Sequence, residues 1–207
     1  RDKKLGNIGL NFSNKPTRKF LVQEIIDIKK YQSYLEIGTF HDELFKQIKC
    51  NKKVGVDPVS GGTIRETSDQ FFKKNKDKFD CIFIDGLHYY SQVKKDIQNS
   101  LKILNPNGII LLHDCLPNNH FEQAVPRCQI TWNGDVWKAI VECRVQEDLD
   151  TYTCYADFGI GAIFNRKNRN ILNLEKRDFS KLKFEEYFHN HKEYMNIIEF
   201  EYLKKII

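Results

Sequence analysis

The stretch FDCIFIDGLHYYSQVKKDI, residues 79–97, decides the fold class of this chain. It begins with a continuous apolar run, Cys81 to Ile84, which is typical of a strand buried on both faces of a parallel sheet. The run ends in Asp85, and His88 follows three residues later. Apolar side chains then recur at helical spacing from Val93 to Leu104. A strand, a polar turn and a helix in this order predict one unit of an α/β fold.

The same ending recurs after three other strand patterns. These patterns are residues 33–35, 53–56 and 109–112, and the acids that follow them are Glu36, Asp57 and, after His113, Asp114. Helical patterns at 44–48, 71–72 and 93–104 separate the strands. Alternating strands and helices predict a parallel sheet with crossover helices.

The carboxyl ends of parallel strands meet at one edge of a sheet, where ligands bind, so we expect these acids to be neighbours. Like charges at close range favour a cationic or hydroxyl-rich ligand. The turn from Glu36 to Asp42 contains one glycine and lacks the G-x-G-x-x-G loop that holds a pyrophosphate. Asp57 is well placed to accept both hydroxyls of a ribose. An adenosyl group with a sulfonium and an amino-acid tail therefore fits better than NAD.

Six segments resemble, in the same order, those of a class I S-adenosylmethionine-dependent methyltransferase. They are YLEIGTF, VGVDP, TSDQFF, FDCIFIDGLHYYSQVKKDI, LNPNGIILLHDCLP and WNGDVWKAI, between Tyr31 and Arg166. They are most similar to a bacterial-type family of small-molecule and glycan O-methyltransferases with D-G-x-H and H-D signatures. The resemblance implies a Rossmann-like α/β fold, with a mostly parallel seven-stranded sheet and helices on both faces. It also implies methyl transfer from S-adenosylmethionine to a hydroxyl of a small molecule or sugar.

The resemblance implies cofactor contacts at five positions besides Asp57. Glu36 and Gly38 are expected to hold the amino-acid end, and Asp85 lies beside the methyl-transfer site. Ser68 and Asp69 are expected at the adenine edge, although one of them capping a helix is an equally good interpretation. Asp42 departs from the family, in which many relatives carry a further glycine.

The expected catalytic residues are His88, Asp85, Asp114 and His113. His88 stands where catechol-type enzymes place a general-base lysine, and a neutral imidazole accepts a proton from a hydroxyl. For His113, an orienting or core role is about as well supported as catalysis, because strand alternation turns it away from the crevice.

The resemblance also implies a metal site at Asp85 and Asp114, since catechol-type methyltransferases bind Mg²⁺ with acids at these strand ends. The third ligand there is commonly Asn or Asp, but this chain has Cys115. Mg²⁺ prefers hard oxygen ligands. We therefore expect weak or absent Mg²⁺ dependence.

The chain is expected to consist of an N-terminal extension and helix (1–30), an S-adenosylmethionine-binding domain (31–166) and a C-terminal helical appendage (167–207). The long polar segment 117–132 is expected to cover the acceptor, and Trp132 is a candidate to line the pocket of a sugar or aromatic acceptor. Asp135 is expected to cap a helix that turns Trp137 into the core. Residues 151–155 and 159–164 predict a closing hairpin. A helical apolar stripe follows, and its default role is core packing, with a homodimer contact or a lid as the alternative: Phe184, Tyr187, Phe188, His191, Tyr194, Met195, Ile198 and Tyr202.

The composition narrows the functional classes further. The 33 basic and 28 acidic residues are interspersed, so the net charge of +5 gives little support to nucleic-acid binding. No apolar run reaches membrane-spanning length, and the first ten residues lack the core of a signal peptide. Six cysteines without C-x-x-C spacing favour buried thiols in a reducing cytoplasm. The rival functions are a non-catalytic binding protein on a degenerate fold and a nicotinamide-dependent oxidoreductase.

Overall fold

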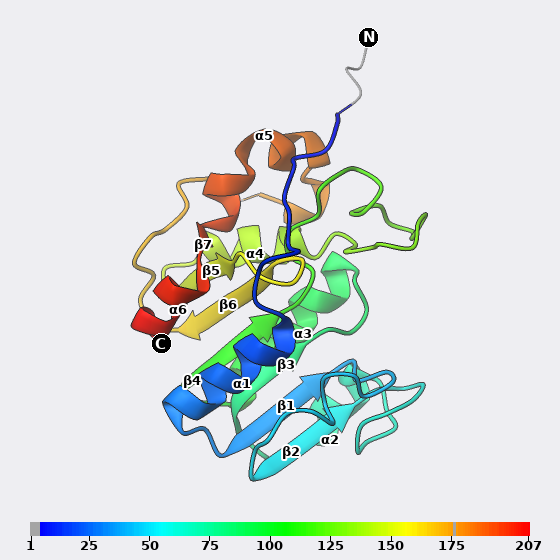
Figure 1. Ribbon diagram of the computed structural model, residues 1–207, viewed down its shortest axis with the longest axis vertical. Coiled ribbons are helices and arrows are strands. Elements are labelled where there is room, and N and C mark those ends of the chain that lie inside the picture. Colours follow the sequence, from blue (N-terminus) through cyan, green and yellow to red (C-terminus); the bar gives the residue numbers. More distant parts are fainter. Residues whose placement is uncertain (1–4, 176) are drawn as a thin grey trace.

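A computed structural model describes residues 5–175 and 177–207, and a single seven-stranded sheet lies at its centre (Figure 1). The strand order is β2-β1-β3-β4-β6-β5-β7. The strands are β1 (Ser33–Ile37), β2 (Lys52–Val56), β3 (Phe79–Ile84), β4 (Leu104–Leu112), β5 (Leu149–Cys154), β6 (Ile160–Asn165) and β7 (Ile197–Ile198). Only β6 runs antiparallel to its neighbours in this sheet. The predicted mostly parallel seven-stranded sheet is confirmed.

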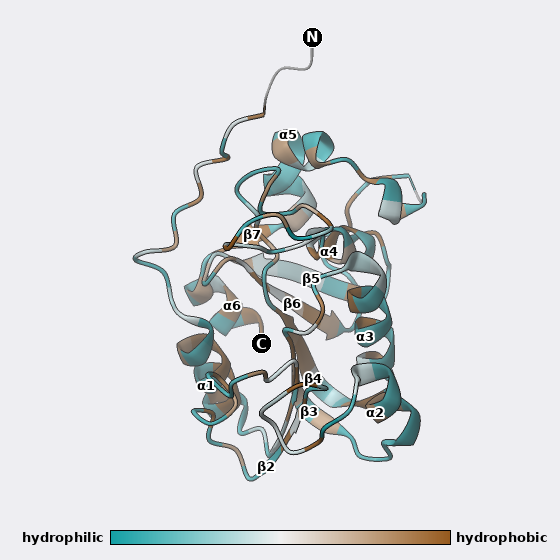
Figure 2. Cartoon of the chain, turned by 90° about the vertical axis from the view of Figure 1, so that its right-hand side faces the viewer, coloured by the Kyte–Doolittle hydropathy of each residue, from teal (hydrophilic) through white to brown (hydrophobic). Residues whose placement is uncertain are grey.

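Helices cover both faces of the sheet (Figure 2). They are α1 (Arg18–Lys29), α2 (Ser68–Lys74), α3 (Tyr90–Ile103), α4 (Trp137–Arg144), α5 (Phe184–Met195) and α6 (Phe200–Ile206), with a short 3₁₀ helix at Phe179–Lys181. The helices α2 to α5 pack on one face, and α1 and α6 pack on the other. Strand β3 supplies both cores, because Ile82 and Ile84 face one layer while Cys81 and Phe83 face the opposite one. A strand that is buried on both sides explains its continuous apolar run.

One expected crossover helix is replaced by turns. Residues 40–47 form successive turns instead of a helix, although Leu44, Phe45 and Ile48 are buried as predicted. Phe40 and Asp42 both have positive φ angles, of 41° and 64°. Left-handed residues at this point prevent a regular helix from starting.

The hairpin of β5 and β6 is confirmed, but the continuous helical stripe from Phe184 to Tyr202 is wrong. Asn196 adopts a left-handed conformation (φ 47°) and ends α5. The chain then forms β7, which pairs with β5, before α6 begins. The stripe is therefore divided among two helices and an edge strand. The division of the chain at residues 30 and 166 stays a prediction.

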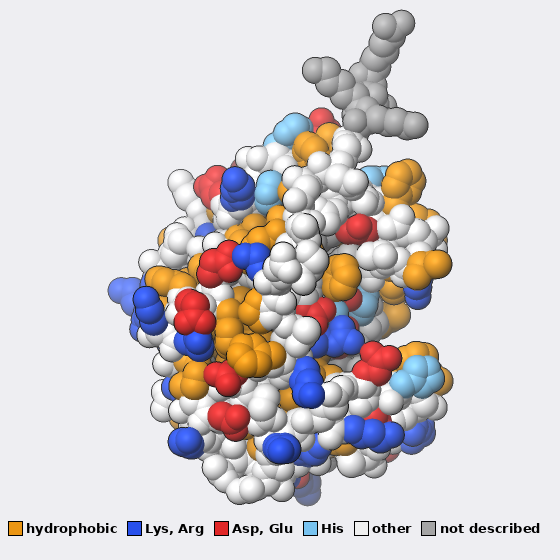
Figure 3. Space-filling model, viewed as in Figure 1, with side chains coloured by type: hydrophobic (Ala, Val, Ile, Leu, Met, Phe, Trp, Pro, Cys, Tyr) orange, Lys and Arg blue, Asp and Glu red, His pale blue; other side chains and the backbone are white. Residues whose placement is uncertain are grey.

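One face of the molecule shows no single dominant charge. Basic and acidic side chains are interspersed over the face drawn in Figure 3. Among the described residues, no helix is both long enough and apolar enough to cross a membrane.

Candidate functional site

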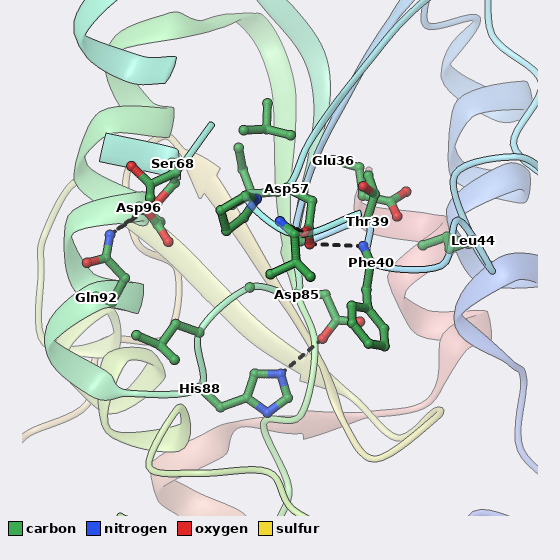
Figure 4. A pocket seen from close by; sticks show the side chains of 18 of the residues that line it. Glu36, Thr39, Phe40, Leu44, Asp57, Ser68, Asp85, His88, Gln92 and Asp96 are labelled. Carbon is green, nitrogen blue, oxygen red and sulfur yellow. Dashed lines mark hydrogen bonds and ion pairs between the residues drawn. The ribbon is translucent and has the colours of Figure 1, made fainter. Parts of the chain in front are cut away.

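A cavity of about 700 Å³ opens at the carboxyl ends of β1, β2 and β3 (Figure 4). Seven of the expected site residues line it: Glu36, Gly38, Asp57, Ser68, Asp69, Asp85 and His88. His113 and Asp114 follow β4 and are not among its lining residues. The fold thus brings seven of the expected site residues to one cavity, and His113 and Asp114 lie behind its wall.

Gly38 is required by the packing of two strand ends against each other. Its φ is +88°, and a Cβ atom added there would come within 2.1 Å of the backbone oxygen of Asp85. Only glycine fits at this approach without moving the backbone. Gly38 therefore has a structural role where β1 and β3 end, and its contact with the cofactor stays a prediction.

Glu36 is a buried acid at one end of the cavity. Glu36 is only 2% exposed, and the Tyr34 hydroxyl donates a hydrogen bond to its Oε2 at 2.5 Å. Burial raises the pKa of Glu36 to about 8, and the negative charge of Asp85 adds to the effect. A cation placed beside Glu36 would favour its ionised form.

Asp57 binds the backbone of two turns. Its Oδ1 accepts hydrogen bonds from the amides of Val59 at 2.7 Å and Ser60 at 3.0 Å, and its Oδ2 accepts from the amide of Phe40 at 3.0 Å. A carboxylate offers about four acceptor positions. Asp57 therefore stabilises the turns and keeps about one position for a ligand.

Asp42 stands where many relatives carry a glycine, and it keeps the left-handed backbone conformation of the turn after β1. Asp42 keeps a left-handed φ of 64°, which aspartate tolerates better than most residues. Its Oδ1 accepts a hydrogen bond from the Gly62 amide at 2.5 Å, and this bond lowers the pKa of Asp42. The substitution therefore joins the turn after β1 to the loop after β2.

His88 lies between two acids at the base of the cavity. Its Nε2 is 3.2 Å from Asp85 Oδ1, and its Nδ1 is 3.3 Å from Asp114 Oδ2 and 3.2 Å from the carbonyl oxygen of Trp132. Burial opposes the charged form, but the hydrogen bond to Asp85 and the charge of Asp114 raise the pKa of His88 above its usual value. Each ring nitrogen of His88 therefore faces an acidic partner, and both nitrogens donate only when the imidazole is protonated.

His113 is buried behind the acid pair and is surrounded by three carboxylates. Its Nδ1 is 3.3 Å from Asp85 Oδ1 and 3.3 Å from Asp114 Oδ2, while its Nε2 is 3.2 Å from Asp157 Oδ1. Burial alone would lower the pKa of His113, but the charges of Asp114 and Asp85 raise it well above the usual value. Burial would raise the pKa of Asp85, but the charges of His113 and His88 and their hydrogen bonds together lower it. His113 thus has no direct access to a ligand in the cavity.

The potential metal ligands form a mixed set. Asp85, His113 and Asp114 each offer an atom within 4.8 Å of the others. Cys115 does not join them, because its thiol contacts the carbonyl oxygen of Leu112 at 3.2 Å and burial raises its pKa well above the usual value. The side chain of Asn133 donates to Asp114 Oδ1 at 3.0 Å.

The loop expected to cover the acceptor does reach the cavity. The ring of Trp132 stacks on that of His88, with centroids 5.1 Å apart and planes 22° apart, and both residues line the cavity. Gly134 has a φ of +65°, and a Cβ atom there would lie 1.9 Å from the His88 carbonyl oxygen. This contact fixes the loop against His88. Trp137 is fully buried, as expected.

The prediction that Asp135 caps the helix containing Trp137 is wrong. Helix α4 begins at Trp137 with Val136 before it, and Val136 makes no side-chain cap. The Asp135 carboxylate instead accepts a hydrogen bond from the amide of Tyr90 at 2.6 Å, at the start of α3. A carboxylate at this end of a helix satisfies an otherwise unpaired amide. Thr67, and neither Ser68 nor Asp69, caps α2.

Sequence reasoning missed several polar residues of the site. Gln92 and Asp96 of α3 line the cavity, and Arg18 and Asp157 contact His113. Asp96 could have been found, because it is a carboxylate on the apolar face of a helix, between Val93 and Ile97. Asp157 follows β5 and carries no local signal.

Comparison with known proteins agrees with this geometry. Residues 25–115 match the family model described as a methyltransferase domain. The matched segment is less than half of the chain. The match runs from the last part of α1 to the residue after Asp114 and so includes most of the cavity wall. No curated protein matches the chain.

Solved structures share the fold at low sequence identity. The O-methyltransferase from Bacillus cereus, solved in complex with SAH, is 16% identical, with a TM-score of 0.51 over 70% of this chain and 79% of its own. The SAH-bound methyltransferase PaMTH1 from Podospora anserina is 15% identical, with a TM-score of 0.54 over 72% and 78%. The O-methyltransferase TomG from Streptomyces achromogenes, in complex with SAM, is 12% identical, with a TM-score of 0.51 over 72% and 78%. This chain therefore shares the Rossmann-like architecture of these structures.

Proposed function

We propose that this protein is an S-adenosylmethionine-dependent methyltransferase that methylates a hydroxyl group of a small molecule or sugar. The observation that carries the proposal is the order of polar groups along one cavity. Glu36 lies on one side, Asp57 lies centrally and Ser68 lies on the other side, with Asp85 and His88 facing the middle (Figure 4). SAM- and SAH-bound structures with the same fold support this choice of cofactor.

Each part of the cofactor meets a suitable group in this arrangement. Burial raises the pKa of Glu36 to about 8. The ammonium group of the amino-acid tail would favour the ionised form of Glu36 and bind to it. The free acceptor position of Asp57 would take a ribose hydroxyl. Ser68 and Asp69 would lie at the adenine edge, since both line the cavity.

Methyl transfer is an in-line displacement, so alignment and removal of one proton are the protein's main tasks. The acceptor oxygen attacks the methyl carbon as the carbon–sulfur bond breaks, and the sulfonium becomes a neutral thioether. We assign the hydroxyl proton to Nε2 of His88. In the tautomer that donates from Nδ1 to the Trp132 carbonyl oxygen, Nε2 is free to accept it once the acceptor replaces Asp85 as its partner.

The residues present do not fit a Mg²⁺ ion at Asp85 and Asp114. Their carboxylates already face the imidazole groups of His88 and His113 at 3.2–3.3 Å. The third position holds the buried Cys115 thiol, which turns to a carbonyl oxygen, whereas Mg²⁺ requires hard oxygen ligands. His113 supplies positive charge to the acid pair and is a positioning residue. We therefore propose methyl transfer with weak or no Mg²⁺ dependence.

Calorimetry on the pure protein tests the proposal. S-adenosylmethionine and its demethylated product should bind, and NAD should not. NAD binding without any S-adenosylmethionine binding would refute it. A non-catalytic binding protein would bind the cofactor but transfer no methyl group to any acceptor.

The natural acceptor can be sought by mass spectrometry of the small molecules that co-purify with the protein. The cysteines, all free thiols, suit a reducing compartment, so we place the protein in the cytoplasm. The homodimer stays a prediction.

A further inference from the structure

A second buried carboxylate, from Asp96 of α3, lies on the side of the cavity opposite Glu36 (Figure 4). Asp96 is 1% exposed and lies between the buried apolar residues Val93 and Ile97. A buried charge is costly unless donors surround it. Among the described residues, no Lys or Arg forms an ion pair with Asp96, although Lys95 lies 3.8 Å from its neighbour Asp69.

The hydrogen-bond donors around Asp96 are too few. The Gln92 side-chain amide has two hydrogens but faces three acceptors: Asp69 Oδ1 at 3.0 Å, Asp96 Oδ1 at 3.1 Å and Ser68 Oγ at 3.2 Å. The Ser68 hydroxyl supplies one more hydrogen. Water can hydrate the half-exposed carboxylate of Asp69, whereas the buried carboxylate of Asp96 depends on Gln92 and Ser68 for its donors. Burial raises the pKa of Asp96 to about 6, which leaves it mostly ionised at neutral pH.

We propose that Asp96 recognises the 6-amino group of the adenine ring of the cofactor. The inference rests on the proposed function and adds a residue that selects the base. With the amino-acid tail at Glu36 and the ribose at Asp57, the base extends toward Ser68 and Asp96 (Figure 4). The exocyclic amino group provides the two N–H donors that this corner lacks. A 6-oxo purine would instead turn a carbonyl oxygen toward an acceptor-only carboxylate.

A purely structural role for Asp96 predicts something different. Gln92 and Asp96 are one helical turn apart, and the contact of Gln92 with Ser68 also joins α3 to α2. Such a tie would affect the stability of the protein and the binding of every ligand alike. Selectivity between a 6-amino and a 6-oxo base depends only on a contact with the base itself.

Calorimetry with S-adenosylhomocysteine and S-inosylhomocysteine separates the two roles. The wild-type protein should bind the adenosyl compound about 10- to 100-fold more tightly, the usual effect of a hydrogen bond to a charged group. In Asp96→Asn, the preference should fall below about 3-fold, because an amide donates to a 6-oxo group as well as it accepts from a 6-amino group. The matched control Asp77→Asn changes an exposed acid outside the cavity and should keep the wild-type preference.

Equal affinity of the wild-type protein for both compounds would overturn the inference without any variant, while leaving the proposed function intact. An Asp96→Asn variant that weakens both compounds by the same factor would also overturn it and would assign Asp96 the structural role. If the wild-type protein binds neither compound, the proposed function fails together with the inference.

Discussion

Replacing His88 with alanine removes the proposed general base and leaves most of the cavity in place. His88 lines the cavity and reaches Asp85 at 3.2 Å, but it lies away from Glu36 and Ser68, which flank the expected cofactor tail and base. A positioned general base is worth about 10²- to 10⁴-fold in rate. Turnover of His88→Ala should fall by this factor, while the affinity for S-adenosylhomocysteine stays within about 3-fold of wild type, a difference below about 1 kcal/mol.

The pH profile makes the assignment of His88 sharper. Its pKa lies above the usual value of about 6.5, because Asp85 and Asp114 outweigh the effect of burial. Only the neutral imidazole accepts a proton, so the wild-type rate should rise as the pH increases through this raised pKa. Asp85→Asn should move the rise to lower pH, since it removes an acidic partner. His88→Ala should show no such rise.

The assay is methyl transfer to an identified acceptor, paired with calorimetry of S-adenosylhomocysteine. His189→Ala, an exposed histidine of α5, is the matched control and should behave as wild type. Wild-type turnover in His88→Ala would refute the assignment. If His113→Ala also remained folded and lost turnover, the base would have to be sought behind the acid pair.

Three further predictions follow from contacts in the cavity wall. Asp57→Ala should weaken cofactor binding by about 1.5–3 kcal/mol in calorimetry, and should lower Tm as well because three backbone amides lose their acceptor; unchanged affinity would mean that the ribose lies elsewhere. Chelator treatment should leave most turnover intact, and a complete loss that Mg²⁺ restores would show that Asp85 and Asp114 form a metal site after all. Gly38→Ala should destabilise the fold by at least about 2 kcal/mol in denaturant unfolding, since its Cβ would lie 2.1 Å from the Asp85 backbone oxygen, whereas Gly6→Ala meets no atom within 4 Å and should have little effect.

Much of the sheet could be predicted from the chain because each strand carries its own signal. The run from Cys81 to Ile84 is buried on both faces, and its apolar residues alternate between two cores. The ends of the strands could be predicted for the same reason. Glu36, Asp57 and Asp85 were expected at these ends, and all three line one cavity. The turns at 40–47 and the break at Asn196 were missed, because a left-handed residue other than glycine carries little signal in the sequence.

The environment of His113 could not be predicted, because it depends on residues that are distant in the chain. Strand alternation correctly turns the side chain away from the crevice, but it does not say what lies there. Asp114, two residues after the end of β4, adopts a left-handed φ of 59°, and its carboxylate lies 3.3 Å from His113 Nδ1. Asp157 approaches from the loop before β6, and the amide of Arg18 donates a hydrogen bond of 2.6 Å to it. Three acids and one imidazole thus meet from three separate parts of the chain. The charge on His113 helps to lower the pKa of Asp85, and Asp85 in turn raises that of His88, so these distant contacts influence the pH at which the proposed base can act.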